Sequence, residues 1–140
     1  MIGPDGRSGG PRPRRDRGAA VVEFVLVSIP LLFLLLAVLQ VAVYLHVRNV
    51  VVASAAEGAR YGANLDRASA DGGPFAEQVL GRGLSSRAAA GIRCVAAEEP
   101  GAGGTVLVAV RCRGTVPTLL SAAGRVLPVD AAARSIKEGR

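Results

Sequence analysis

The chain has 140 residues, of which 50% are hydrophobic and only 4% aromatic, and its formal net charge is +6 at pH 7. A chain of this length and composition can hold one small domain beside a membrane helix, which excludes two independent domains. The positive charge does not indicate nucleic-acid binding, because 5 of the 17 basic residues lie before Gly18, and the rest of the chain has 12 basic and 9 acidic residues.

Residues 1–18 consist largely of Gly, Pro and Arg. They contain too few apolar side chains to bury a core, so we expect them to be disordered. Basic residues beside a first membrane span tend to stay in the cytoplasm. The pattern therefore predicts a basic leader on the cytoplasmic side of the cell membrane and an extracytoplasmic C-terminal part.

An apolar run follows from Phe24 to Val47 and contains no charged residue. As a helix it would be about 36 Å long, against roughly 30 Å for a hydrocarbon core. A soluble core helix would instead show a polar stripe with a period of about 3.6 residues. A cleaved signal peptide would have an apolar region of only about 7–15 residues. The run therefore predicts one membrane span at residues 24–47, interrupted only by Ser28, Gln40, Tyr44 and His46.

Glu23 lies directly before this span. A carboxylate at the centre of a membrane helix costs roughly 2.5–3.5 kcal/mol, and less near an end. The helix macrodipole would offset about 0.3–1 kcal/mol of that cost in the first turn. This structural explanation does not account for Gly18, which stands five residues earlier, directly after the basic cluster.

The segment from Gly18 through Ala19 to Glu23 and Phe24 resembles the processing site of type IV prepilins of the Flp/Tad branch. The resemblance implies that a prepilin peptidase cuts after Gly18, so that residues 1–18 are a cleaved leader and Ala19 becomes the mature N-terminus. The new α-ammonium group, with a pKa of about 7.7–8.0, would be a cation able to pair with Glu23. In that family the glutamate is associated with subunit assembly.

Further residues extend the likeness. With Arg48-Asn49 and the block from Glu57 to Ala63, the chain resembles a TadE-like protein, a minor pseudopilin of the tight-adherence system. The resemblance implies a role in Flp/Tad pilus assembly or the associated secretion and adhesion machinery. The implied partners are the membrane, the prepilin peptidase, other pilins or pseudopilins and Tad membrane platform proteins, with no nucleic acid.

Beyond the span the pattern still favours a helix, which we expect to run from about Ala20 to Tyr61 within a segment 19–63. We expect Tyr44 to be an anchor at the membrane interface. Glu57 and Arg60 have the i,i+3 spacing of a helical ion pair. One stripe of the helix carries small and apolar residues, namely Val52, Ala55, Ala56 and Ala59.

Residues 64–140 predict a small α+β domain with one helix and a two- to three-stranded antiparallel sheet, which makes the whole chain an α+β protein of pilin-like design. A linker is expected at Asn64–Pro74 and a loop or short helix at Thr115–Gly124. Pro128 favours an edge position or a break in the last strand. The expected elements are a helix at Phe75–Ala90 and strands at Ile92–Ala97, Thr105–Arg113 and Val126–Ile136.

Cys94 and Cys112 fall on the two arms of the predicted hairpin. If the domain is extracytoplasmic, an oxidising environment permits a disulfide between them, and the alternative is a pair of buried free thiols. A structural zinc site needs four ligands, which two cysteines and the single His46 cannot supply. We therefore predict a disulfide and neither a metal nor another cofactor.

No catalytic constellation is present in the sequence, so we predict that the chain is not an enzyme: there is no histidine relay, phosphate-binding glycine motif or paired-carboxylate spacing. The main alternative to a pseudopilin is a single-pass membrane-anchored binding module outside any pilus, which would keep its leader. A secreted enzyme fragment with a retained anchor is a third possibility, which would need a convergent polar pocket.

Overall fold

The computed structural model describes residues 16–117 and 126–139. The expected disorder of residues 1–15 and the expected loop or short helix after Pro117 lie outside these residues. The chain divides into two compact units, Met1–Val38 and Leu39–Arg140.

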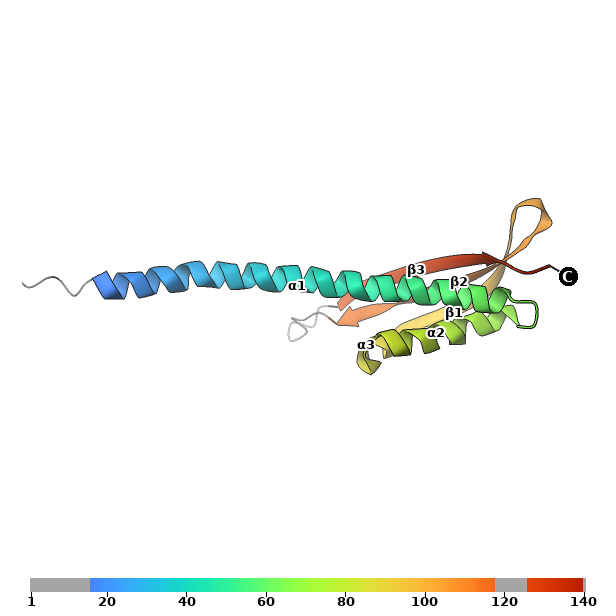
Figure 1. Ribbon diagram of the computed structural model, residues 1–140, viewed down its shortest axis with the longest axis horizontal. Coiled ribbons are helices and arrows are strands. Elements are labelled where there is room, and N and C mark those ends of the chain that lie inside the picture. Colours follow the sequence, from blue (N-terminus) through green and yellow to red (C-terminus); the bar gives the residue numbers. More distant parts are fainter. Residues whose placement is uncertain (1–15, 118–125, 140) are drawn as a thin grey trace, which may run out of the picture. The chain divides into compact units, whose positions relative to one another are not determined.

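The longest element is α1, Asp16–Ala63, an α-helix of 48 residues (Figure 1). It begins earlier than predicted, because Asp16, Arg17 and Gly18 are already helical. It includes Pro30, which has no backbone N–H to donate within the helix. Separately, the hydroxyl of Ser28 donates to the carbonyl oxygen of Phe24 at 2.7 Å. Among the described residues α1 contains the one candidate membrane span, and the most apolar window of that span is not buried by other parts of the protein.

Two α-helices follow α1 where the sequence predicts one. The break lies at Leu84, which is extended (φ −124°, ψ 162°), and at Ser85, whose hydroxyl accepts a hydrogen bond from the backbone N–H of Ala88. Such an N-cap begins a new helix rather than continuing the old one. The linker is also shorter than expected, because helix starts before Pro74. The elements are the 3-10 helix η1, Ser69–Asp71, and the α-helices α2, Gly72–Gly83, and α3, Ser86–Ala90.

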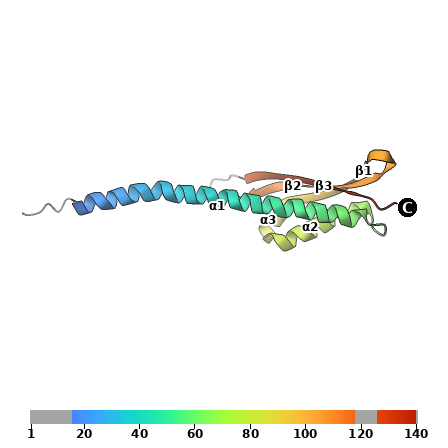
Figure 2. The same ribbon diagram turned by 45° about the horizontal axis from the view of Figure 1, so that its top comes forward.

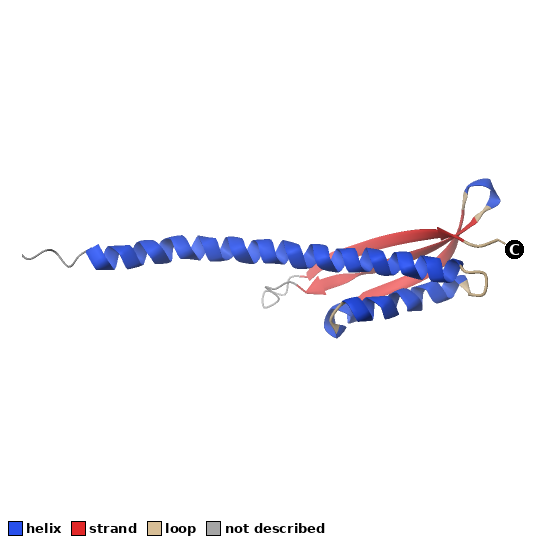
Figure 3. Ribbon diagram, in the orientation of Figure 1, coloured by secondary structure: helices blue, strands red, loops and turns tan. Residues whose placement is uncertain are grey.

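The remainder of the domain is a β-sheet (Figure 3). Its strands are antiparallel and follow the order β1-β2-β3. The strands are β1, Ile92–Pro100; β2, Val106–Pro117; and β3, Val126–Ile136, with the 3-10 turn η2, Ala102–Gly104, between the first two. Gly103 and Gly104 have φ values of 66° and 77°, which only glycine adopts readily. The first two strands are longer than predicted, and Pro128 lies in an edge strand as its missing N–H requires.

The core lies between the inner face of the sheet and the helices α1 and α2. The residues that α1 contributes to the core cluster are Val47, Val51, Ala55 and Ala59, whereas Val52 is 44% exposed. Of the predicted stripe, Ala55 and Ala59 are therefore buried and Ala56 is half-buried, and only Val52 was placed on the wrong side. Because nearly every residue of this segment is small or apolar, periodicity alone cannot identify the face that meets the sheet.

Candidate processing and assembly site

The residues predicted for processing lie on an open stretch of α1. Gly18 has no atom within 4 Å of the position that a Cβ would occupy, and the side chain of Phe24 is 73% exposed. Glu23 and Ala19 are also exposed. Sequence position brings these four residues together on the first turns of one helix, and in this structure they are accessible to an enzyme or a neighbouring subunit.

Glu23 stands two turns inside α1, because the helix begins at Asp16. The macrodipole acts mainly within the first turn, so it provides little stabilisation for this carboxylate in the uncut chain. A chain beginning at Ala19 would place an ammonium group only four residues before Glu23, which is about 6 Å along a helix axis. A cut after Gly18 would therefore add a cationic group near this carboxylate.

The block from Glu57 to Ala63 forms the joint between α1 and the rest of the domain. A Cβ on Gly58 would meet the carbonyl oxygen of Gly72 and would lie 2.7 Å from the Cβ of Ala76. A Cβ on Gly62 would lie 2.8 Å from the carbonyl oxygen of Ser69. These two glycines allow α1 to approach α2 and η1 to backbone contact.

Other side chains of this block contact the segments that follow α1 or pair with each other on the helix surface. The Tyr61 ring stacks on Phe75 with centroids 4.1 Å apart, and the Arg67 guanidinium lies 4.8 Å from the centre of the Tyr61 ring. Glu57 and Arg60 form the predicted i,i+3 ion pair, at 3.7 Å, on the exposed side of the helix. The block therefore has a structural task, which its sequence alone did not reveal.

Cys94 and Cys112 are directly opposite in the β1–β2 register and form a disulfide, as the sequence predicts. Both lie on the inner face of the sheet, and Cys112 is fully buried. The backbone N–H of Cys94 donates to the carboxylate of Glu77 on α2 at 3.0 Å. The disulfide therefore links β1 to β2. The carboxylate of Glu77 accepts a hydrogen bond from a backbone N–H of β1 that faces away from β2.

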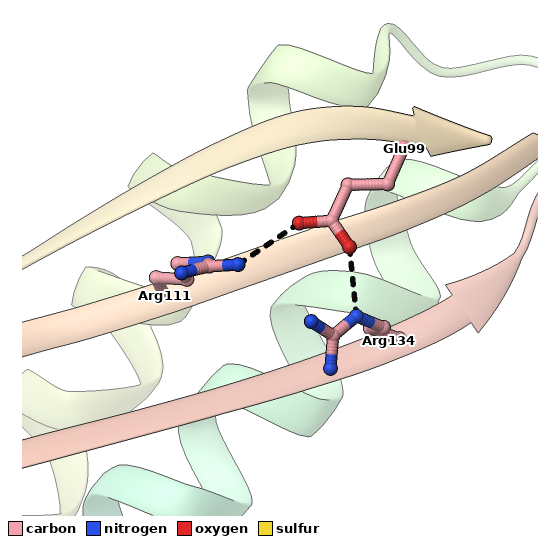
Figure 4. Close-up of polar contacts among 3 residues, drawn as sticks. All are labelled: Glu99, Arg111 and Arg134. Carbon is pink, nitrogen blue, oxygen red and sulfur yellow. Dashed lines mark hydrogen bonds and ion pairs between the residues drawn. The ribbon is translucent and has the colours of Figure 1, made fainter.

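Sequence reasoning missed a charged cluster on the outer face of the sheet (Figure 4). Glu99 accepts from Arg134 at 2.8 Å and from Arg111 at 3.1 Å. These hydrogen bonds, led by that from Arg134, lower the pKa of the Glu99 carboxyl from its ordinary value of 4.5. In the sheet, Ala109 of β2 pairs with Ala97 of β1 and with Arg134 of β3. It is only 2% exposed, because the Glu99–Arg134 ion pair crosses over β2.

A second polar cluster joins segments far apart in sequence. The Lys137 ammonium donates to Glu98 at 2.7 Å and to the hydroxyl of Ser69 at 2.6 Å, and Ser69 donates to Glu98 at 2.5 Å. The hydrogen bond from Lys137, followed by that from Ser69, lowers the pKa of the Glu98 carboxyl.

The backbone beside this second cluster ties it to α1. The N–H of Lys137 donates to the carbonyl oxygen of Val106 at 2.8 Å, and the N–H of Glu138 donates to that of Ala63 at 3.0 Å. The latter bond satisfies a carbonyl at the end of α1 that has no partner within the helix. These contacts thus connect the segment after β3 to the C-terminal end of α1. Within the described ranges no group of three or more His, Cys, Asp or Glu side chains could hold a metal ion.

Comparison with known proteins gives one positive result. Residues 18–60 match the family model described as TadE-like protein. No curated protein matches the chain. No solved structure matches it either. The match begins at Gly18 and ends within the block from Glu57 to Ala63.

Proposed function

Because the chain is TadE-like over residues 18–60, we propose that it is a minor pseudopilin that takes part in assembly of a Flp/Tad pilus or of the associated secretion and adhesion machinery. The match to the TadE-like family model supports involvement in Tad/Flp pilus systems, and the pseudopilin role is the finer proposal. The observation that carries it is the spacing of Gly18, Glu23 and Phe24 at the front of an exposed apolar helix.

In this proposal the chain is a substrate and not a catalyst. A prepilin peptidase cuts after Gly18, and the new ammonium of Ala19 meets the carboxylate of Glu23 on a neighbouring subunit. An intramembrane carboxylate is costly unless it is paired, so this pairing favours one register between subunits. The partners are other pilins or pseudopilins and the Tad membrane platform proteins.

The proposed topology places the N-terminus in the cytoplasm and the domain outside. One candidate span followed by a folded domain fits a single-pass membrane protein. The direction rests on the basic residues before Gly18, which tend to stay cytoplasmic. The disulfide supports the same direction, because such bonds persist in oxidising compartments.

The proposal is tested by the N-terminal sequence of the membrane-fraction protein, produced with and without its prepilin peptidase. The expected product begins at Ala19, only when the peptidase is present, and it disappears in Gly18→Ala. An intact leader under all conditions would contradict the proposal and favour a membrane-anchored binding module. A cut after Val47 would identify a signal peptide.

A second experiment separates processing from assembly. Glu23→Ala is expected to remain in the membrane fraction while surface pili decrease, because the ammonium of a neighbouring subunit loses its partner. Glu57→Ala, which removes an exposed carboxylate outside the apolar run, serves as the matched control and should leave pili unchanged. Normal pili in Glu23→Ala would remove the assembly role from this residue.

A further inference from the structure

The domain packs against α1 before the apolar run ends. Val47, the last residue of that run, is 5% exposed and belongs to the same core cluster as Val116 of β2 and Val129 of β3. One turn earlier, the hydroxyl of Tyr44 donates to the carbonyl oxygen of Pro128 at 3.4 Å. The end of the sheet where β2 finishes and β3 begins therefore reaches the last turns of the predicted span. In Figures 1 and 2 this is the end opposite the turn between α1 and α2.

This packing changes which residues are available to lipid. Tyr44 precedes Arg48, the first charged residue after the run, by four residues, or about 6 Å along the helix axis. If the helix meets hydrocarbon only from Phe24 to Val43, it still provides about 20 residues and about 30 Å, which matches a hydrocarbon core. Tyr44 then marks the boundary, and the end of the sheet lies at the same level.

The side chains at this end of the sheet suit such a boundary. We call Val126, Leu127 and Pro128 the hairpin end. Val126 is 57% exposed, Leu127 is half-buried and Pro128 is exposed, and β3 has no charged residue before Asp130. On the neighbouring helix Leu45 is 49% exposed. Exposed apolar side chains beside a membrane helix lose contact with water if they enter the interfacial layer of the bilayer.

We propose that the hairpin end is a second membrane contact, in which Val126, Leu127 and Pro128 enter the lipid headgroup and acyl-chain boundary beside the helix. The proposal needs the membrane span but neither the peptidase cut nor a pilus. The partner is the lipid bilayer itself. Two contacts, one through the helix and one through the sheet, would restrict tilting of the domain over the membrane surface.

The test uses single tryptophans, because the natural chain has none. Val126→Trp places the probe at the hairpin end, and Ile136→Trp places it at the other end of the same strand, where the natural side chain is 63% exposed. The two positions lie on the same face of β3, roughly 33 Å apart. Leu34→Trp, at a position 61% exposed on α1, reports the span itself.

Each full-length variant is reconstituted into phosphatidylcholine vesicles with brominated acyl chains. We expect Val126→Trp and Leu34→Trp to be quenched several-fold more by these lipids than Ile136→Trp, and Ile136→Trp to be quenched most by acrylamide in the water. Equal acrylamide quenching at positions 126 and 136 would overturn the second contact while leaving the span intact. Protection of position 126 from both quenchers would also overturn it, because a protein surface would then cover the hairpin end.

The remaining outcome concerns the span. Absence of lipid quenching at position 34 would overturn the span, and with it both the hairpin contact and the membrane part of the proposed function. The thermal unfolding midpoint of each variant serves as the folding check. Since all three positions are exposed, we expect midpoints close to that of the natural chain. If Val126→Trp is unfolded, Pro128→Trp on the same face carries the same test.

Discussion

At the scale of single residues, Gly58 shows how closely α1 approaches α2. A Cβ at this position would lie 2.7 Å from the Cβ of Ala76 and still closer to the carbonyl oxygen of Gly72. Real Cβ atoms do not tolerate such contacts, so a larger residue must push the helices apart. The glycine is required by this approach, even though glycine inside a helix is itself destabilising by about 0.5–1 kcal/mol relative to alanine.

We therefore predict that Gly58→Ala lowers the free energy of unfolding of the domain by about 1–3 kcal/mol, the range typical of overpacked contacts. Gly81→Ala is the matched control, because Gly81 lies in α2 with no atom near its added Cβ. It should be neutral or stabilising by up to about 1 kcal/mol. Denaturant unfolding of the detergent-solubilised protein measures both. Equal effects of the two substitutions would show that the α1–α2 contact is not tight.

At the scale of elements, the disulfide joins the two arms of the β1–β2 hairpin across a sequence separation of 18 residues. Closing a loop of this size is expected to contribute about 3 kcal/mol, largely by restricting the unfolded chain. Small domains with few aromatic residues have limited cores, so this contribution is a large share of the total.

We predict that Cys94→Ala combined with Cys112→Ala lowers the free energy of unfolding by about 3 kcal/mol. Reduction of the natural protein with dithiothreitol should lower it by a similar amount, which separates loss of the cross-link from loss of the buried sulfur atoms. Urea unfolding of oxidised, reduced and substituted protein makes the comparison. An unchanged midpoint after confirmed reduction would contradict the prediction.

At the scale of the whole molecule, two carboxylates connect elements that are distant in sequence. Glu98 holds Lys137 beside the end of α1, and Glu99 holds Arg111 and Arg134 across the sheet. Both carboxyls have a pKa below the ordinary value of 4.5. Their contribution to stability is therefore complete above that value and is lost as the pH falls through the lowered pKa.

We predict that the natural protein loses thermal stability on acidification below about pH 4.5, and that Glu98→Gln combined with Glu99→Gln loses less over the same range. At neutral pH the natural protein should have the higher midpoint. The two curves should converge as the carboxylates become protonated. Thermal unfolding across a pH series measures the difference, and parallel curves would show that these carboxylates do not contribute. High salt should weaken the effect, since the groups are exposed.

The sequence by itself determined the features that depend on local order along the chain. The apolar run, the spacing of Gly18, Glu23 and Phe24, and the position of one cysteine on each arm of a hairpin can all be read from neighbouring residues along the chain. Pro128 indicated an edge strand for the same reason, since a missing N–H restricts where a residue can pair. The sequence allowed either two or three strands, and the structure shows three.

Only the tertiary structure decided which surfaces meet. Val51 rather than Val52 faces the core. The sequence could not predict which of the two is buried, because nearly every residue of this part of α1 is small or apolar. The helix break at Ser85 depends on its N-cap hydrogen bond. The roles of Gly58 and Gly62 depend on α2 and η1, which pack against them. Lys137 donates hydrogen bonds to Ser69 and Glu98, which lie 68 and 39 residues away in the sequence. Such contacts arise when packing brings distant segments together, and no pattern of neighbouring residues specifies them.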